Sequence, residues 1–286
     1  MAYVKPAEVS DMMVDSGAAK TNLPPLQMVI RGMLGGAILA FATTLAFTAV
    51  QQTSIGLAGA LIFPVGFVMI VLLGLELVTG SFALIPLAVA LRKTTMSRML
   101  SAFGWAILGH LIGCGLYAAL YVLTITSMGS SPDAPLAQTL ISLSETKTLG
   151  YKAMGSEGML LVILKAILCN WMVTLGVVLA FTSQSTGGKI AAMWLPILTF
   201  FAQGFEHAVV NMFVIPAGML LGADVSMSDW WVWNQIPVLL GNFIGGALFT
   251  GILLYLSHKK LVRTPAASLH QADAPAPGLG EGRSSL

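Results

Sequence analysis

A glutamate and a histidine stand side by side in the middle of a long apolar stretch of the chain. The segment Gly204-Phe205-Glu206-His207 lies within WLPILTFFAQGFEHAVVNMFVIPAGMLLGA, which runs from Trp194 to Ala223. Ionisable side chains at membrane depth are costly, so they are expected to face a pore or a protein interior and to act there. A histidine ring can exchange a proton near neutral pH, which would suit proton transfer to a weak-acid anion. The alternative is a buried polar pair that only holds helices together.

Two features favour the functional interpretation. The pair is flanked by Gly204 and Asn211 and bracketed by Pro196 and Pro216, and its glycine-glutamate half recurs at residues 74–77. Backbone that is freed at membrane depth is tolerated only where it lines a cavity or is buried in protein. A polar, breakable segment in each half of the chain therefore predicts a transport path.

The composition is that of an integral membrane protein. The 286-residue chain has 56% hydrophobic and 9% charged residues and a mean hydropathy of +0.85, which is too apolar for a water-soluble domain. A membrane-spanning helix needs about 20 apolar residues. Six stretches are long enough, and the second and fifth exceed one crossing, which favours interrupted helices there: about 27–50, 57–91, 103–127, 159–183, 190–222 and 232–257.

The positions of the basic residues predict the orientation. Lysine and arginine follow the second, fourth and sixth spans and precede the first, whereas the loops after spans one and five contain none. By the positive-inside rule both termini lie in the cytoplasm, and we expect a multi-pass protein of the cell inner (plasma) membrane. Lys147 and Lys152, in the long loop after the third span, then lie outside, where they would suit an anionic substrate.

Three segments follow from these patterns. Residues 1–26 contain a predicted amphipathic helix, with Pro6 at its start and Lys20 at its end. We expect this helix on the cytoplasmic side, against the membrane or a neighbouring subunit. Residues 27–257 form the six-span transporter domain. Residues 258–286 are rich in Pro, Ala, Gly and Ser and are expected to be a disordered cytoplasmic tail.

The two halves of the chain contain matching segments. Residues 109–117 align with 241–249 at an offset of 132, residues 31–36 align with 165–170 at 134, and the two glycine-glutamate segments align at 130. Each half holds three spans, an odd number, so the second half must be inserted upside down relative to the first. Inverted repeats place the substrate path at their interface, near the bilayer midplane, where discontinuous helices form it.

The polar residues of the two breaks are expected to have different roles. Glu76 and Glu206 should accept hydrogen bonds from the backbone amides that the breaks leave free. Thr79 and His207 are then the groups left to meet the substrate.

Four stretches of the chain resemble the formate/nitrite transporter family. They are PAEVSDMMVDSGAAKTNLP near the amino end, GLELVTGSF in the second span, LKAILCNWMV in the fourth and QGFEHAVVNMFVIPAGMLLGA in the fifth. The resemblance covers about residues 5–260, and the fourth- and fifth-span motifs are its specific part. It implies a homopentamer of aquaporin-like protomers, each with its own pore. We expect no cofactor and no metal. Such proteins pass small monovalent anions such as formate, nitrite, hydrosulfide, acetate or lactate, often together with a proton.

The resemblance also implies roles for single residues. The family's central pore histidine matches His207, the threonine that hydrogen-bonds it matches Thr79, and the span-four asparagine matches Asn170. The lysine that gathers anions in the outer vestibule matches Lys152, with Lys165 as the alternative. The apolar constrictions would be formed by Phe63, Phe67 and Phe200 outside and by Leu77, Val78 and Val173 inside. A bulkier phenylalanine is usual where this chain has Val78.

Together these residues predict a mechanism. A bare anion in a narrow apolar pore loses hydration that few fixed charges can replace, so neutralisation is the less costly route. A lysine at the mouth raises the local anion concentration. We expect the anion to enter past Lys152, to lose part of its water at Phe67 and Phe200, and to take or share a proton with His207, whose ring Thr79 orients. In a rival scheme the anion stays charged and pairs with a cationic histidine.

Other classes of protein fit less well. A channel for a neutral solute such as water or glycerol is the alternative, but no Asn-Pro-Ala pair stands at the helix breaks. A haem-binding redox subunit usually needs two opposed ligands at matching depth. Only His110 and His207 lie within spans, and His110 aligns with Asn242, which favours a helix-packing role. Neither a nucleotide-binding loop nor a metal-ligand spacing is present, so we expect no enzyme activity, and we expect no nucleic-acid partner.

Overall fold

The computed structural model describes residues 3–259, and this part of the chain is helical apart from one isolated antiparallel bridge between Tyr3 and Ser183. The predicted disordered tail, 258–286, lies outside the described residues except for its first two. The helices in chain order are α1 (Pro6–Lys20), α2 (Pro25–Thr53), α3 (Gly56–Ile62), α4 (Pro64–Leu72), α5 (Val78–Ala90), α6 (Met96–Ile125), α7 (Pro135–Ala153), α8 (Ser156–Phe181), α9 (Thr186–Ala202), α10 (Ala208–Leu220), α11 (Met227–Trp230), the π-helical η1 (Trp231–Gln235), α12 (Ile236–Ile244), the π-helical η2 (Gly245–Leu253) and α13 (Leu254–His258).

Four helices are long and apolar enough to cross a membrane. They are α2, α6, α8 and the continuous helix of residues 227–258 that runs from α11 to α13. Two further apolar stretches are interrupted: α3 and α4 are followed after a break by α5, and α9 is followed after a break by α10. Both breaks fall in the second and fifth apolar stretches, where the sequence predicts interrupted helices.

Glycine ends the helix before each break. Gly74 and Gly204 both have a φ of 64°, a left-handed conformation that glycine adopts without steric cost. The next residue closes the helix end: the amide of Leu75 donates to the carbonyl of Ile70 at 3.0 Å, and that of Phe205 donates to Phe200 at 3.3 Å. This is the Schellman arrangement of a helix C-terminus. The chain then continues extended and starts a new helix three to four residues later.

Small residues let the long helices approach one another closely. Helix α2 packs along α6, and α8 packs along α12 and α9. A Cβ atom added at Gly113 on α6 would collide with the carbonyl of Met33, and one added at Gly245 would collide with the carbonyl of Ile167. The glycines of the third and sixth spans therefore serve close helix packing, because backbone approach of this kind excludes larger side chains.

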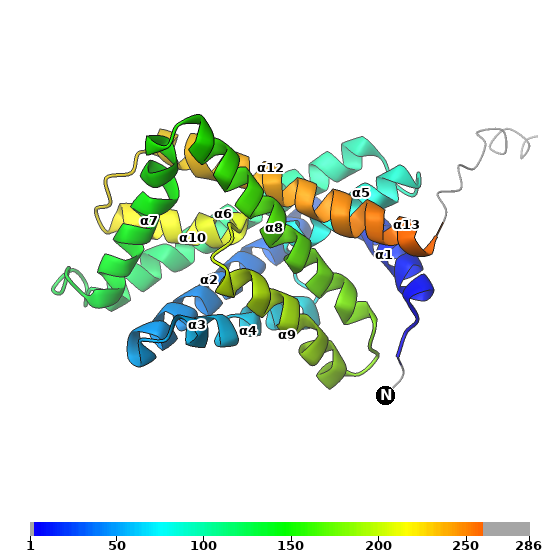
Figure 1. Ribbon diagram of the computed structural model, residues 1–286, viewed down its shortest axis with the longest axis horizontal. Coiled ribbons are helices and arrows are strands. Elements are labelled where there is room, and N and C mark those ends of the chain that lie inside the picture. Colours follow the sequence, from blue (N-terminus) through cyan, green and yellow to red (C-terminus); the bar gives the residue numbers. More distant parts are fainter. Residues whose placement is uncertain (1–2, 260–286) are drawn as a thin grey trace, which may run out of the picture.

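Two amphipathic helices cap opposite ends of the molecule. Figure 1 shows α1 at the right-hand end of the long axis and α7 at the left-hand end. Helix α1 packs on α5, and α7 packs on α10. The predicted N-terminal helix is thus present, but it buries Val9 and Met13 against Leu84 and Leu87 of the same chain, while Met12 is exposed. The apolar face that was expected to meet the membrane or another subunit therefore serves intramolecular packing.

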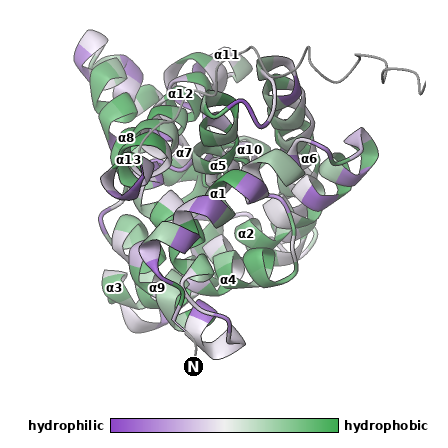
Figure 2. Cartoon of the chain, turned by 90° about the vertical axis from the view of Figure 1, so that its right-hand side faces the viewer, coloured by the Kyte–Doolittle hydropathy of each residue, from purple (hydrophilic) through white to green (hydrophobic). Residues whose placement is uncertain are grey.

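The outer surface of the long helices is apolar. Figure 2 shows hydrophobic residues over most of the long helices and hydrophilic residues on α1 and on connecting loops. On α6 alone, Leu108, Ile112, Leu116 and Leu120 are all exposed at a spacing of four residues. A continuous exposed apolar stripe would be unfavourable in water, so this surface fits a protein surrounded by lipid.

Candidate functional site

The two helix breaks bring a threonine and a histidine together in the interior. Thr79 lies in the first turn of α5, and His207 is the residue that caps the start of α10. The hydroxyl of Thr79 and Nε2 of His207 are 3.1 Å apart, and both residues are buried. Nδ1 of His207 accepts a hydrogen bond from the amide of Val210 at 3.2 Å. In the neutral ring the proton is therefore on Nε2, which donates it to the threonine oxygen.

Aromatic rings cover the histidine on one side. Phe200 stacks on the His207 ring with centroids 5.6 Å apart, and Phe63 contacts Phe200 edge-to-face at 5.7 Å. Phe63 also stacks on Phe201 at 4.0 Å. The structure thus places two of the three predicted outer aromatic residues, Phe63 and Phe200, in one cluster beside the histidine.

Phe67, the third predicted outer residue, lies away from this pair of aromatic rings. It lines a cavity on the α1 side of the protein together with Leu77 of the first break. Phe63 and Phe67 are one helical turn apart, which corresponds to a rise of about 6 Å. The spacing shows that the two rings share a helix face, but it leaves open on which side of the histidine each one lies. Leu77, Val78 and Val173 are all buried, as side chains of a tight constriction would be.

The two buried glutamates do not bind the free amides of the breaks, contrary to the sequence prediction. Glu76 accepts from Nζ of Lys20 at 2.6 Å and from the hydroxyl of Ser81 at 3.1 Å. Glu206 accepts from Nζ of Lys147 at 2.8 Å. A buried carboxylate is costly unless it is paired, and an ammonium group compensates its charge better than a neutral amide can.

Two further groups complete the surroundings of Glu206. The Tyr151 hydroxyl donates to its Oε1 at 2.8 Å, and Nδ2 of Asn211 donates to its Oε2 at 2.7 Å. Burial, and then the negative charge of Glu206, raise the pKa of Tyr151 well above its ordinary value. The tyrosine therefore keeps its proton and acts as a donor to the carboxylate.

His110 and Asn242 bind the free amides instead. The sequence favoured helix packing for His110 and gave Asn242 no role. Nε2 of His110 accepts from the amide of Val78 at 3.0 Å, and its Nδ1 bonds the carbonyl of Gly32 at 2.7 Å. In the second half, Oδ1 of Asn242 accepts from the amide of Ala208 at 2.9 Å. The internal repeat could have indicated this shared role, because His110 and Asn242 align at an offset of 132.

Asn242 makes the same kinds of backbone contact as His110, and we call each of these two residues an amide clamp. Nδ2 of Asn242 donates to the carbonyl of Ala166 at 2.8 Å, and Ala166 follows Gly32 by 134 residues. The same Nδ2 atom of Asn242 also donates to the carbonyl of Glu206 at 2.9 Å. Both ring nitrogens of His110 are occupied by backbone groups, so this histidine is not free to bind haem. Within residues 3–259, no group of three or more His, Cys, Asp or Glu side chains is arranged to hold a metal ion.

Asn170 joins the first break to the last span. Its Nδ2 donates to the carbonyl of Thr79 at 3.0 Å and to that of Asn242 at 2.6 Å, while its buried Oδ1 has no hydrogen-bond partner among residues 3–259. The predicted span-four asparagine thus lies directly beside the threonine of the site. Its unpaired oxygen can accept from a water molecule or from a protonated solute, which are the usual partners of such a group.

The three lysines around α7 occupy different places. Lys152, the predicted anion-gathering residue, pairs with Asp229 at 2.7 Å, and its side chain is 51% exposed. Lys165, the alternative, lies over the ring of Tyr151 with Nζ 5.8 Å from the centroid. Lys147, which the sequence did not single out for this role, pairs with Glu206, the neighbour of His207 in the chain.

The sequence of this chain is similar to those of known transporters and channels. The sequence profile described as "Formate/nitrite transporter" matches residues 7–256. An uncharacterized transporter of Bacillus subtilis, YrhG, is 33% identical over 272 residues, which cover 92% of this chain and 97% of the relative. The formate channel BtFdhC of Bacillus thuringiensis is 29% identical over 270 residues, 91% of this chain and 98% of the relative.

Solved structures share the fold. An ion channel of the FNT family superimposes with a TM-score of 0.74 over 87% of this chain and 98% of its own, and a pentameric formate channel with formate bound superimposes with a TM-score of 0.67 over 82% and 97%. Both are 22% identical in sequence to this chain. The helical arrangement described above is therefore one that known channels also adopt.

Proposed function

Because the chain belongs to the formate/nitrite transporter family, we propose that it carries small monovalent weak-acid anions, formate, nitrite or a similar ion, across the cytoplasmic membrane. The path is channel-like and includes proton exchange at His207. The names of relatives support the substrate class, since they include a formate channel and a probable formate transporter from Methanothermobacter thermautotrophicus.

One observation carries the mechanism: a buried histidine faces a threonine hydroxyl at 3.1 Å and stacks on the ring of Phe200, and the aliphatic residues proposed for the inner constriction are buried as well. An anion that arrives between these apolar surfaces has little water left, so its charge is costly there. The ring first takes up a proton from the aqueous side and becomes imidazolium. Transfer of that proton from the imidazolium to the anion, or sharing of it, removes the cost and leaves the ring neutral again. Thr79 accepts from Nε2 and thereby holds the ring in one orientation.

We propose that the six spans form two inverted three-helix repeats, as in aquaporin-like proteins. Three observations support this: the odd number of spans in each half, the equal φ of Gly74 and Gly204, and the equivalent amide clamps of His110 and Asn242. Each half also places a lysine from a capping helix on its glutamate. Residues 1–26 and 258–286 would then both be cytoplasmic, and five protomers would assemble in the inner membrane, each with its own pore.

The lysine that concentrates anions at the outer mouth is proposed to be Lys152, with Lys165 as the alternative. The Lys152 side chain is 51% exposed, whereas that of Lys147 is 18% exposed and its charge is neutralised by the buried Glu206. We expect Lys152→Gln to lower uptake at low anion concentration several-fold, and Lys165→Gln to change it by less than twofold. Equal losses in the two variants would contradict the assignment.

The decisive experiment is uptake by proteoliposomes. Formate, nitrite, hydrosulfide and lactate are supplied singly at several pH values, with glycerol as the neutral control. We expect uptake of at least one anion to rise as the external pH falls, and glycerol to be excluded. Glycerol entry without anion flux would refute the proposal and favour a neutral-solute channel.

A variant separates proton exchange from simple anion pairing. His207→Asn keeps a hydrogen-bonding side chain but cannot exchange a proton near neutral pH. Transport by this variant with the pH dependence of the wild type would exclude the histidine as the proton donor. Thr79→Ser is the matched control, because it retains the hydroxyl that contacts the ring.

A further inference from the structure

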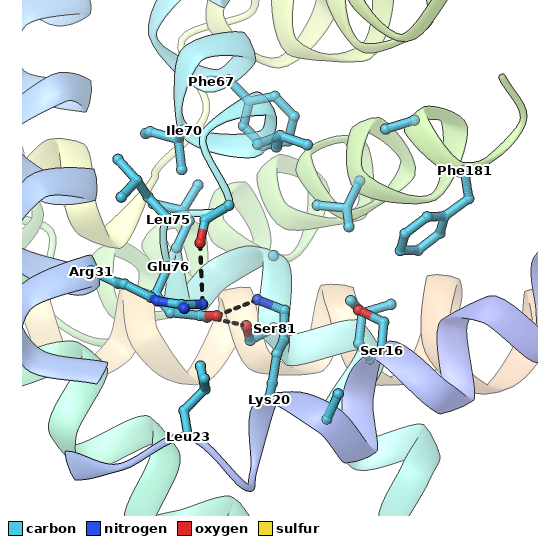
Figure 3. Close-up of a pocket in the computed structure, with 18 residues that line it drawn as sticks. Ser16, Lys20, Leu23, Arg31, Phe67, Ile70, Leu75, Glu76, Ser81 and Phe181 are labelled. Carbon is cyan, nitrogen blue, oxygen red and sulfur yellow. Dashed lines mark hydrogen bonds and ion pairs between the residues drawn. The ribbon is translucent and has the colours of Figure 1, made fainter. Parts of the chain in front are cut away.

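A cavity of about 310 Å³ opens on the α1 side of the protein, below the first helix break. Figure 3 shows its walls: Ser16, Lys20 and Leu23 from α1 and the turn after it, Phe67 and Ile70 from α4, Ser81 from α5 and Phe181 from α8. Arg31 reaches in from α2. Leu77, a residue of the proposed inner constriction, lines the cavity as well.

The charges of this cavity do not cancel. Its ionisable lining residues are Lys20, Arg31 and Glu76. Lys20 and Glu76 form an ion pair at 2.6 Å, so the ammonium and the carboxylate neutralise each other. Arg31 makes no ion pair with any residue of the described part of the chain. Its Nη1 has one contact, with the carbonyl of Gly74 at 3.4 Å. The cavity therefore carries one surplus positive charge, and that charge belongs to Arg31.

The guanidinium is well suited to a carboxylate or a similar planar anion. It stays charged at all relevant pH values and offers several N–H donors in one plane, so it can form two parallel hydrogen bonds with such an anion. The contact with Gly74 is long for a hydrogen bond and engages only Nη1, which leaves the other donors of the group free. The hydroxyl of Ser16 lies in the same cavity and can donate to a second oxygen, whereas that of Ser81 already donates to Glu76.

We propose that this cavity is a second anion-binding site, in which Arg31 holds a small monovalent carboxylate or oxyanion at the α1 end of the pore. The inference rests on the proposed transport function, because the anion would bind in this cavity on its way between the solvent and the constriction at Leu77. Helix α1 supplies one wall, so the α1 side has an anion site of its own, in addition to the proposed site near Lys152 at the opposite end.

The test uses benzenesulfonate, which stays charged and is too bulky for the constriction. Its binding to the purified full-length protein in detergent is measured by saturation-transfer NMR, which does not depend on transport. We expect Arg31→Gln to raise the dissociation constant about tenfold and Arg31→Lys to raise it two- to threefold. Arg98→Gln is the matched control, because Arg98 contacts Asn22 and lies outside this cavity. We expect it to stay within twofold of the wild type.

Membrane vesicles of known orientation supply the second measurement. Benzenesulfonate added on the α1 side should inhibit formate flux, and the same concentration on the α7 side should not. The inhibitory concentration should rise about tenfold in Arg31→Gln and remain unchanged in Arg98→Gln.

The outcomes separate the two proposals. Equal binding by the wild type and Arg31→Gln, an equal loss in Arg98→Gln, or no binding by the wild type would overturn the site at Arg31. Binding that depends on Arg31 in a protein that transports no small anion would overturn the transport function instead, while the cavity would remain an anion-binding site.

Discussion

Replacement of His110 tests whether the amide clamp holds the pore together. The side chain is fully buried, accepts from the amide of Val78 and bonds the carbonyl of Gly32. His110→Leu is similar in size but removes both contacts, so it leaves the buried amide of Val78 unpaired and takes the second hydrogen bond from the Gly32 carbonyl inside α2. An unpaired buried donor costs about 1–3 kcal/mol and a lost hydrogen bond about 1 kcal/mol, which gives a loss of about 2–4 kcal/mol. Thr79 follows Val78 directly, so we also expect uptake of formate to fall at least tenfold.

His110→Asn should be far milder, because asparagine performs the same task at the equivalent position of the second half. Asn242 accepts from one backbone amide and donates to the carbonyls of Ala166 and Glu206. We expect a loss below about 2 kcal/mol for the asparagine variant, since it replaces both polar contacts and leaves only a small cavity.

The assay is unfolding in mixed micelles with a rising fraction of sodium dodecyl sulfate, followed by circular dichroism, and paired with uptake by proteoliposomes. His258→Asn, at the exposed end of α13, is the control for loss of a histidine. The reasoning is refuted if His110→Leu unfolds at the same detergent fraction as the wild type. It is also refuted if the asparagine and leucine variants lose equal stability.

Three further predictions concern other parts of the fold. Because the folded pKa of Tyr151 is raised above the unfolded value of about 10, stability is complete below pH 10 and falls above it by up to about 1.4 kcal/mol per pH unit. Tyr151→Phe should remove part of that fall between unfolding curves at pH 9 and pH 11. A side chain at Gly17 would collide with the carbonyl of Leu84, so Gly17→Leu should detach α1 at a cost of about 1–3 kcal/mol and speed its proteolysis. Gly204 has a φ of 64° with open space around it, so Gly204→Ala should cost about 1 kcal/mol in micelle unfolding and Gly204→Asn less.

The pairing of each buried glutamate with a lysine illustrates the limit of local sequence patterns. Lys20 and Glu76 are 56 positions apart, and Lys147 and Glu206 are 59 positions apart. No periodicity connects residues at such distances, and several lysines flank each half. Only the docking of α1 on α5 and of α7 on α10 selects these two as partners.

The depth of a side chain along the pore is a second property that local sequence patterns do not determine. The family resemblance implied that Phe63 and Phe67 both belong to the outer constriction, but the histidine that defines inside and outside lies at the start of a different helix. The structure puts Phe63 with Phe200 and puts Phe67 with Leu77. Relative depth depends on how far one helix slides along another, and packing between helices decides it.

The membrane class, the six apolar stretches, the two breaks and the polar residues at these breaks could be predicted from the amino-acid sequence. These depend on local properties: hydrophobic length, the left-handed preference of glycine, and the cost of an ionisable group in lipid. The tertiary structure alone decided which lysine meets which glutamate, which side chains bind the free amides, and that Arg31 opens into a cavity with an uncompensated charge. Those contacts join residues far apart in the chain, so their energies exist only once the helices have packed.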